Sequence, residues 1–319
     1  MKRRLEKSPR GLNVIDRLIR QVMADSPYIL KNILQDASVD KGKRLRARLF
    51  LEFSGTADSG SAKIAAAIEL LHIATLIHDD VIDRSLLRRK KAALHTVWGV
   101  PVSVLAGDYI FSKSFLLLSE GRDRRIWHEV TRALSEVIIG EISQQLRRGD
   151  LSMRRDEYLT LIGKKTGDLF GVACKIGAMR RRPQRISPET AYRFGKLIGT
   201  AYQMLDDCGD YLLRQREKTK LLDIQNGIVT LPLIILKERC PEEAGTFLKR
   251  VLKKQEISLG DISKLRSLMR SYGVLPECVR EIKDCIELAS RLMTEGSFAR
   301  CGSVVLSFID HEVARLCLG

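Results

Sequence analysis

The stretch "IAAAIELLHIATLIHDDVID" (residues 64–83) sets the first expectation about the fold. Its apolar residues cover nearly every face of a helix, so the segment is expected to lie in a helical core. It ends in three carboxylates, Asp79, Asp80 and Asp83, which we call the first acidic motif. On a helix, Asp79 and Asp83 lie one turn apart on the same face, with Asp80 to one side. Like charges at this spacing repel each other, so a cation is expected beside them.

The whole chain has the composition of a helical protein. Its 319 residues are 45% hydrophobic but only 6% aromatic, and eight are proline. No segment alternates convincingly with period two, and no linker separates two domains. The sequence therefore predicts an all-α fold in which residues 1–319 form a single large helical bundle. Apolar residues recur at helical spacing in 14–34, 45–56, 62–82, 101–119, 127–148, 156–178, 189–213, 229–239, 244–254, 261–271, 278–294 and 302–317.

A second acidic motif, formed by Asp206, Asp207 and Asp210 in "QMLDDCGD" (203–210), follows another apolar helix. A single cluster of this kind is more often solvated helix surface than a binding site. Two clusters, each at the end of a buried stretch, favour a bound cation. Hard oxygen ligands suit Mg²⁺, which completes its shell with water and phosphate oxygens. All six aspartates are candidate metal ligands, and the two motifs are expected to form a two-sided clamp for a diphosphate.

The charge excess points to an anionic partner. The formal net charge is +16 and the pI is near 9.7. Nucleic acid is disfavoured, because basic clusters such as "MRRRPQR" (179–185) lack interleaved aromatic residues. Phosphorylated small molecules fit better, since arginine and lysine bind phosphate directly. Taken singly, each basic residue is more often solvated surface. The basic segments are "GKRLR" with Lys43, Arg44 and Arg46, "LLRRKK" with Arg88 and Arg89, "GKKTGD" with Lys164 and Lys165, and "REKTK" with Lys218 and Lys220.

The sequence also indicates a compartment. The basic N-terminus is not followed by an apolar signal region, and no uninterrupted apolar stretch approaches the roughly 20 residues of a membrane span. Seven cysteines are scattered without metal-ligand or redox spacing, so they are read as reduced thiols. A cytoplasmic protein is expected.

Several motifs in order give the chain a resemblance to the trans-type isoprenyl diphosphate synthases, over essentially its whole length. They are "GKRLR", "LLHIATLIHDDVIDRSLLRR", "LAGDYIFSKSF", "KKTGDLF", and "AYQMLDDCGDY" followed by "VTLPL". The resemblance implies an all-α bundle with a central cavity, usually a homodimer, that condenses isopentenyl diphosphate with an allylic diphosphate. Magnesium, as three ions, would hold the allylic diphosphate through Asp79, Asp83 and Asp206.

The resemblance also assigns substrate contacts residue by residue. Arg88, Lys165, Thr166 and Gln203 match positions that contact the allylic diphosphate, and Lys165 is also a candidate catalytic residue. Lys43, Arg46, His72 and Arg89 match the pocket for isopentenyl diphosphate. Asp108 in "LAGDY" is expected to brace the bundle. Ala74 and Thr75 are small where relatives that make short products tend to carry an aromatic residue, which predicts a long-chain product.

Some positions depart from the family pattern. Ile228 stands where a lysine is usual, and Lys218 or Lys220 would have to replace that contact. Ala47 replaces a proline after "GKRLR". Two alternatives therefore stay open: a weakly active or regulatory subunit of a heteromeric synthase, and a class I terpene cyclase. A transient membrane contact during release of a hydrophobic product is a further expectation.

Overall fold

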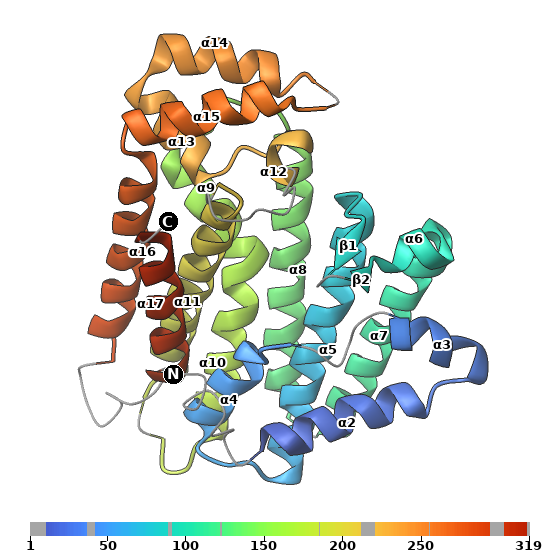
Figure 1. Ribbon diagram of the computed structural model, residues 1–319. Coiled ribbons are helices and arrows are strands. Elements are labelled where there is room, and N and C mark those ends of the chain that lie inside the picture. The colour runs from blue at the N-terminus through green and yellow to red at the C-terminus, as the bar shows by residue number, and fades with distance from the viewer. Residues whose placement is uncertain are drawn as a thin grey trace. The chain divides into compact units, whose positions relative to one another are not determined.

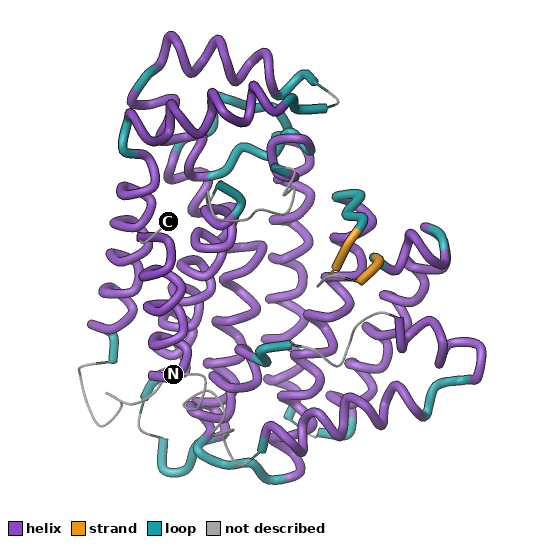
Figure 2. The backbone as a smooth tube through the Cα atoms, viewed as in Figure 1, coloured by secondary structure: helices purple, strands orange, loops and turns teal. Residues whose placement is uncertain are grey.

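The computed structural model describes residues 11–36, 42–88, 91–121, 123–184, 186–211, 221–254, 256–293 and 303–317. Regular structure in these ranges is almost entirely helical, which confirms the predicted all-α class (Figures 1 and 2). Arg89 and Lys218, both expected to contact substrate, lie outside the described residues. The helices and strands are α2 (Leu12–Ala24), α3 (Tyr28–Asp36), α4 (Leu45–Ser54), α5 (Ser59–Ile82), β1 (Leu87–Arg88), β2 (Lys91–Ala92), α6 (Leu94–Trp98), α7 (Val100–Ser119), α8 (Arg124–Leu146), α9 (Arg155–Ile162), η1 (Gly163–Gly167), α10 (Asp168–Arg180), α11 (Pro188–Gly209), α12 (Leu222–Gln225), α13 (Leu231–Arg239), α14 (Pro241–Val251), α15 (Leu259–Ser271), α16 (Val274–Arg291) and α17 (Ser303–Cys317).

The two helices that end in acidic motifs begin at side-chain caps. The Asp58 carboxylate accepts a hydrogen bond from the Ser61 amide at 2.8 Å and so starts α5. Ser187 plays the same part for α11, where the Thr190 amide donates to its hydroxyl at 3.0 Å and Pro188 is the first helical residue. These caps satisfy amides that have no partner within the helix.

Three expectations about the elements are wrong. The range 14–34 contains two helices, because Pro27 cannot donate the amide bond that would continue α2 into α3. The range 156–178 is interrupted by the π-helical turn η1 between α9 and α10. A two-stranded antiparallel hairpin, β1–β2, follows α5; each strand has two residues, which is too short for an alternating pattern to appear in the sequence.

Two compact units can be distinguished. Unit 1 is Met1–Arg132 with Val172–Tyr192, and unit 2 is Ala133–Gly171 with Arg193–Gly319. The chain passes from one unit to the other within α8, α10 and α11. The single-domain expectation stays a prediction, and each unit is described by itself.

The core of unit 1 is the antiparallel pair α5 and α7. The Ser114 hydroxyl of α7 donates to the Ala67 carbonyl oxygen of α5 at 2.9 Å, and His78 near the other end of α5 contacts Val104. Alanines 65, 66, 67 and 74 of α5 are fully buried, which permits this close approach.

By length and composition, α5 and α7 could each cross a bilayer. The most apolar window of α5 is 72% buried inside the protein, as expected for a core helix, whereas that of α7 is only 33% buried. Most of the apolar window of α7 is therefore not buried in the core of unit 1.

Candidate active site

The first acidic motif lies where α5 ends in unit 1. Asp79 and Asp83 are half-buried, whereas Asp80 is only 6% exposed. The Arg88 guanidinium, carried back by the hairpin, binds the Asp80 carboxylate with Nη2–Oδ1 at 2.7 Å and Nε–Oδ2 at 2.9 Å. One carboxylate therefore has a cationic partner that the sequence did not reveal, because Arg88 was assigned to substrate. The two carboxylates on the accessible face are Asp79 and Asp83.

The residue before the motif fixes α5 against α7. His78 packs so closely on Gly107 that a Cβ built there would lie 2.3 Å from Nε2. The same nitrogen lies 3.0 Å from the Val104 carbonyl oxygen and 3.4 Å from Asp108 Oδ1. His78 is thus held as a structural partner, and Asp108 contacts it from α7 in agreement with its expected bracing role.

The "GKRLR" segment divides into one bracing and two candidate substrate residues. Arg44 is 6% exposed, and its Nε donates to Asp16 Oδ1 at 2.9 Å. Its Nη1 lies 3.8 Å from Glu69 Oε2 of α5. Arg46 is 8% exposed and Lys43 is exposed. The departure at Ala47 has a structural role, because its amide donates to Glu69 Oε1 at 3.0 Å. A proline at this position could not form that bond.

The predicted chain-length residues lie on α5, before the first acidic motif. Ala74 is fully buried, and the half-buried Thr75 donates its hydroxyl to the His72 carbonyl oxygen at 2.8 Å. His72 itself is half-buried. No aromatic side chain stands at Ala74 or Thr75.

The second acidic motif lies where α11 ends in unit 2. Asp206 is exposed and Asp210 is half-buried, whereas Asp207 is 7% exposed. The Tyr158 hydroxyl donates to Asp207 Oδ2 at 2.5 Å, and Gln203 Nε2 donates to Oδ1 at 2.7 Å. As in the first motif, the middle carboxylate is turned inward and bound by protein groups.

The Asp207 partners belong to a longer chain of hydrogen bonds. The Thr166 hydroxyl donates to Gln203 Oε1 at 2.6 Å, and the amide nitrogen of Gln203 then donates to Asp207. Thr166 and Gln203, both expected to contact substrate, are thereby brought together with the motif. Tyr158 was missed from the sequence, because a tyrosine one residue after Glu157 on an amphipathic helix carries no distinguishing pattern.

Two carboxyl groups of the second acidic motif have raised pKa values. Burial and the neighbouring Asp206 charge raise the pKa of Asp207 to about 6, despite the opposing effect of the Tyr158 and Gln203 hydrogen bonds. Burial, Asp206 and Asp207 together raise the pKa of Asp210 to about 7. Burial is the main cause of both shifts, and each carboxylate further disfavours ionisation of the next.

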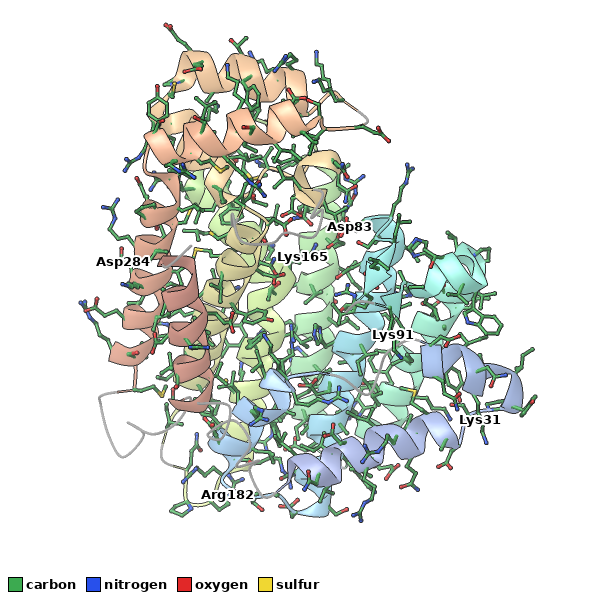
Figure 3. All side chains as sticks on the ribbon, in the orientation of Figure 1. Lys31, Asp83, Lys91, Lys165, Arg182 and Asp284 are labelled. Carbon is green, nitrogen blue, oxygen red and sulfur yellow. The ribbon has the colours of Figure 1, made fainter. Side chains whose placement is uncertain are left out.

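Lys165 lies in the π-helical turn η1 of unit 2, and Figure 3 labels it. Its Nζ contacts Glu141 Oε2 and Gln144 Oε1 of α8, each at 2.6 Å. The turn packs directly on α8, because a Cβ at Gly140 would lie 2.7 Å from the Lys165 backbone nitrogen. The π-helical turn and the α8 partners were not predicted; π-helical turns occur frequently at functional sites.

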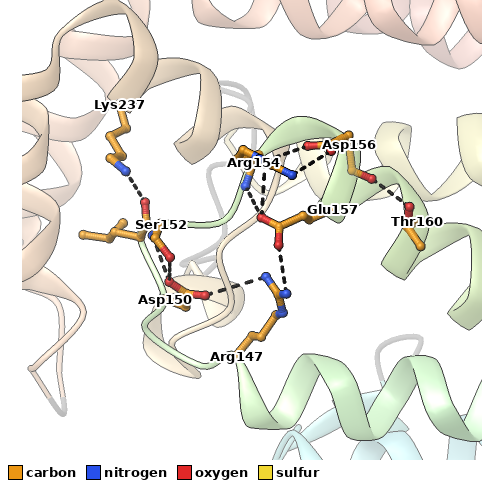
Figure 4. A network of polar contacts seen from close by, with 9 residues as sticks. Arg147, Asp150, Ser152, Arg154, Asp156, Glu157, Thr160 and Lys237 are labelled. Carbon is orange, nitrogen blue, oxygen red and sulfur yellow. Dashed lines mark hydrogen bonds and ion pairs between the residues drawn. The ribbon is translucent and has the colours of Figure 1, made fainter.

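A polar network at the start of α9 positions Tyr158 (Figure 4). Glu157 accepts from Arg147 Nη2 at 2.9 Å and from the Arg154 amide at 3.0 Å, which closes a capping box at the helix N-terminus. Lys237 binds the Leu151 carbonyl oxygen in the preceding loop. The helix that carries Tyr158 is therefore anchored one residue before it.

The departure at Ile228 puts an apolar side chain in the core. Ile228 is 6% exposed, and its amide donates to the Asp223 carbonyl oxygen at 2.7 Å. It follows Gly227, whose φ of 71° is a backbone conformation that favours glycine. The side chain at this position thus contributes packing and no charge.

Within the ranges that the structure describes, no group of three or more histidine, cysteine or acidic side chains converges as a ready metal cage. Mg²⁺ is typically bound by one or two carboxylates, and water and phosphate supply its other ligands. Burial and the neighbouring carboxylates raise the pKa values of Asp207 and Asp210, so negative charge on this cluster is disfavoured without a bound cation. The oxygen donors of each motif fit a hard divalent cation. The accessible carboxylates are Asp79 and Asp83 in unit 1, and Asp206 and Asp210 in unit 2.

The chain is similar to known proteins. The polyprenyl synthetase family profile matches residues 27–269. Solanesyl diphosphate synthase 2 of Arabidopsis thaliana is 28% identical over 285 residues, which cover 86% of this chain and 67% of that protein. The short chain isoprenyl diphosphate synthase of Methanothermobacter thermautotrophicus is 30% identical over 310 residues, covering 91% and 94%.

The fold is shared with solved structures. The polyprenyl synthase of Caulobacter crescentus CB15, crystallised with calcium and isoprenyl diphosphate, superposes with a TM-score of 0.85 at 29% identity and covers 95% of this chain and 94% of that one. Together with the family match over 27–269, this confirms the resemblance inferred from the motifs. The chain belongs to the polyprenyl synthetase family of prenyltransferases, enzymes that use a divalent metal and diphosphate substrates.

Proposed function

We propose that the protein condenses isopentenyl diphosphate with an allylic diphosphate, head to tail and in trans, to give a linear polyprenyl diphosphate of long chain length. The observation that carries the proposal is the arrangement repeated at the ends of α5 and α11. In both motifs the middle aspartate is buried and bound by protein groups, while the first and third stay on the accessible side. Two such motifs suit a diphosphate held through divalent ions.

Ionisation of the allylic C–O bond leaves a carbocation and expels pyrophosphate. Three Mg²⁺ ions, held by Asp79, Asp83, Asp206 and Asp210, would neutralise the charge that develops on that leaving group. Lys165 supplies a cationic contact of the chain itself. The double bond of isopentenyl diphosphate then attacks the cation, and loss of a proton to pyrophosphate completes the step. The chain's other task is to orient both substrates and exclude water.

The substrate contacts follow the family positions. Thr166, Gln203 and Lys165 would bind the allylic diphosphate in unit 2, and their observed hydrogen bonds orient them around Asp207 and α8. Lys43, Arg46 and His72 would bind isopentenyl diphosphate in unit 1. Arg88 would also contact the allylic diphosphate, while its guanidinium holds Asp80.

A long-chain product is supported by the small residues before the first acidic motif. Ala74 and Thr75 leave no aromatic floor on α5, so a growing tail would meet little bulk there. The name of the Arabidopsis relative, a solanesyl diphosphate synthase, is consistent with this length, and the name of the archaeal relative shows that the family also makes short products.

The exposed apolar face of α8 supports a homodimer. Ile138, Ile139 and Ile142 are 48%, 44% and 54% exposed, and Leu146 is 82% exposed. Apolar residues spaced along one helix face are typical of an oligomer interface. A heteromeric subunit is the second candidate, favoured by Ile228, because the buried apolar side chain supplies none of the charge expected there. A cytoplasmic location remains part of the proposal.

The test is to incubate the purified chain with isopentenyl diphosphate, allylic primers of several lengths and Mg²⁺, and then to size the products. A ladder of long linear diphosphates is expected from the chain alone. Ala74→Phe should truncate the ladder by filling the path below Asp79, while Ala74→Ser, which adds little volume, should leave it unchanged.

Each other outcome contradicts a named part of the proposal. Cyclic hydrocarbon would identify a terpene cyclase, and turnover that begins only after a second protein is added would identify a heteromeric subunit. A ladder of unchanged length in Ala74→Phe would refute the chain-length assignment while leaving the condensation intact.

A further inference from the structure

The β1–β2 hairpin of unit 1 is followed directly by α6 (Figure 1), and large apolar side chains of both are exposed. Leu86 and Leu87 are 64% and 67% exposed, Val97 is 54% exposed and Trp98 is 37% exposed. The two segments adjoin, because the amide of Ala93, the N-cap of α6, donates to the Leu86 carbonyl oxygen at 2.9 Å. We call Leu86, Leu87, Val97 and Trp98 the apolar rim. Apolar side chains gathered in this way mark an interaction surface.

The apolar rim is accompanied by positive charge. Between Asp83 and Asp108 the sequence contains five lysine or arginine residues and no aspartate or glutamate; of the five, Arg88 is paired with Asp80 and two lie outside the described residues. Arg84 and Lys91 are both exposed on either side of the hairpin leucines, and Figure 3 labels Lys91. Leucine, tryptophan and basic side chains together are the set that binds the interface of a bilayer with anionic headgroups.

The backbone at Arg84 is a separate indication. Arg84 has a φ of 52°, in the left-handed region, directly after α5, and the Ser85 amide donates to the Asp80 carbonyl oxygen at 3.0 Å to close the helix end. Glycine or asparagine adopts this conformation more easily. An arginine at a strained position indicates that its side chain has a role.

Trp98 is held in place rather than loosely exposed. Its indole N–H donates to Asp36 Oδ2 of α3 at 2.9 Å, so the ring is oriented at the surface. Tryptophan with its N–H bonded and one face in solvent is typical of side chains that lie at membrane interfaces.

We propose that the apolar rim, with Arg84 and Lys91, docks unit 1 on a lipid bilayer that carries anionic headgroups. A second copy of the chain fits this surface less well, because two faces with the same positive excess repel each other. Nucleic acid would use the charges but would leave Leu86 and Leu87 in water. Only the bilayer uses both the leucines and the charges.

Docking would place the end of α5 at the membrane. The hairpin begins at Leu87, shortly after Asp83, and Arg88 in the same strand binds Asp80. A hydrophobic product formed at the first acidic motif could then pass into lipid. This consequence rests on the proposed function, whereas the docking itself does not.

The experiment is flotation of the purified full chain with vesicles, without substrate. Binding is expected to vesicles of phosphatidylcholine mixed with phosphatidylglycerol, and to weaken by about tenfold or more with phosphatidylcholine alone or at high salt. Leu86→Ser with Leu87→Ser should weaken binding to the mixed vesicles by about tenfold or more. Arg84→Asn with Lys91→Ser should have a similar effect, and asparagine tolerates the left-handed backbone.

The matched control is Leu259→Ser with Lys253→Ser, which removes the same kinds of exposed side chain from unit 2. It should bind mixed vesicles like the parent chain, and all variants should keep their thermal midpoints. Equal binding to both vesicle types, or equal loss in the control, would overturn the proposal. Full binding of the leucine variants to mixed vesicles would also overturn it. The same holds if the weaker binding of a variant is traced to a change in self-association or to loss of bound nucleic acid. Condensation in detergent tests the proposed function separately, because it should be unchanged in the leucine variants.

Discussion

The ends of α5 and α11 carry the same five-residue pattern of aspartates, yet the protein stabilises them differently. In the first acidic motif the middle carboxylate, Asp80, is bound by the Arg88 guanidinium. In the second acidic motif the middle carboxylate, Asp207, is bound by the neutral donors Tyr158 and Gln203. One cluster therefore has an internal cation, and the other relies on hydrogen bonds and on protons.

This difference predicts different responses to a metal. At the first motif Arg88 binds Asp80, and a divalent ion would meet the two accessible carboxylates, Asp79 and Asp83. At the second motif the pKa values of Asp207 and Asp210 are about 6 and about 7, so a bound cation would displace protons held near neutral pH. Similar sequence letters thus encode different electrostatics, set by groups that lie elsewhere in the chain.

The largest expected effect is loss of turnover when an accessible carboxylate is removed. Asp79→Ala and Asp206→Ala should each reduce kcat by about a thousandfold or more, because stabilisation of the leaving group is the main catalytic contribution. Initial-rate measurement of the condensation checks this. Asp25→Ala is the control, since this exposed aspartate lies outside both motifs and the variant should keep most of the activity. Full activity in Asp79→Ala would contradict the metal-clamp proposal.

A smaller effect is expected on the free energy of unfolding, and it should differ between the partners of Asp80 and Asp207. Arg88→Gln removes the only cation paired with Asp80 among the described contacts and should destabilise the fold by about 2 kcal/mol, reduced from a fully buried pair because Arg88 is 32% exposed. Tyr158→Phe removes a neutral donor and should cost about 1–2 kcal/mol, because Gln203 remains bound to the carboxylate. Chemical denaturation measures both.

Tyr109→Phe is the matched control for the tyrosine change, because its hydroxyl bonds only a neutral partner, Ser26, at 3.0 Å. Its loss should cost about 1 kcal/mol or less. If Tyr158→Phe were no more destabilising than Tyr109→Phe, the special role of the Tyr158–Asp207 bond would be refuted. If Arg88→Gln had no effect on stability, the ion pair would not be what fixes Asp80.

The sequence predicted the all-α class and most helix positions, because apolar spacing and caps are local features. It could not predict the break at η1 or the hairpin, since the first depends on α8 packing at Gly140 and the second on two residues per strand. It named both acidic motifs. It could not predict which aspartates are buried and which are accessible. Asp80 and Asp207 are held inward by Arg88 and Tyr158, which contact them only in the folded structure.

The smallest expected effect is a pH dependence that belongs to the second acidic motif. A carboxyl group whose pKa is raised on folding favours the folded state below its unfolded pKa, and that stability is lost as pH rises through the folded value. The ordinary pKa of an aspartate is 3.8, and the folded values are about 6 for Asp207 and about 7 for Asp210, so the metal-free protein should lose stability between about pH 4 and pH 7. We expect the thermal midpoint to fall by about 3 °C or more over this range. Asp210→Asn should flatten the dependence. Mg²⁺ should stabilise the protein more at the higher pH, because it replaces the protons that are lost; an equal effect of Mg²⁺ at both pH values would show that the second motif does not exchange protons for metal.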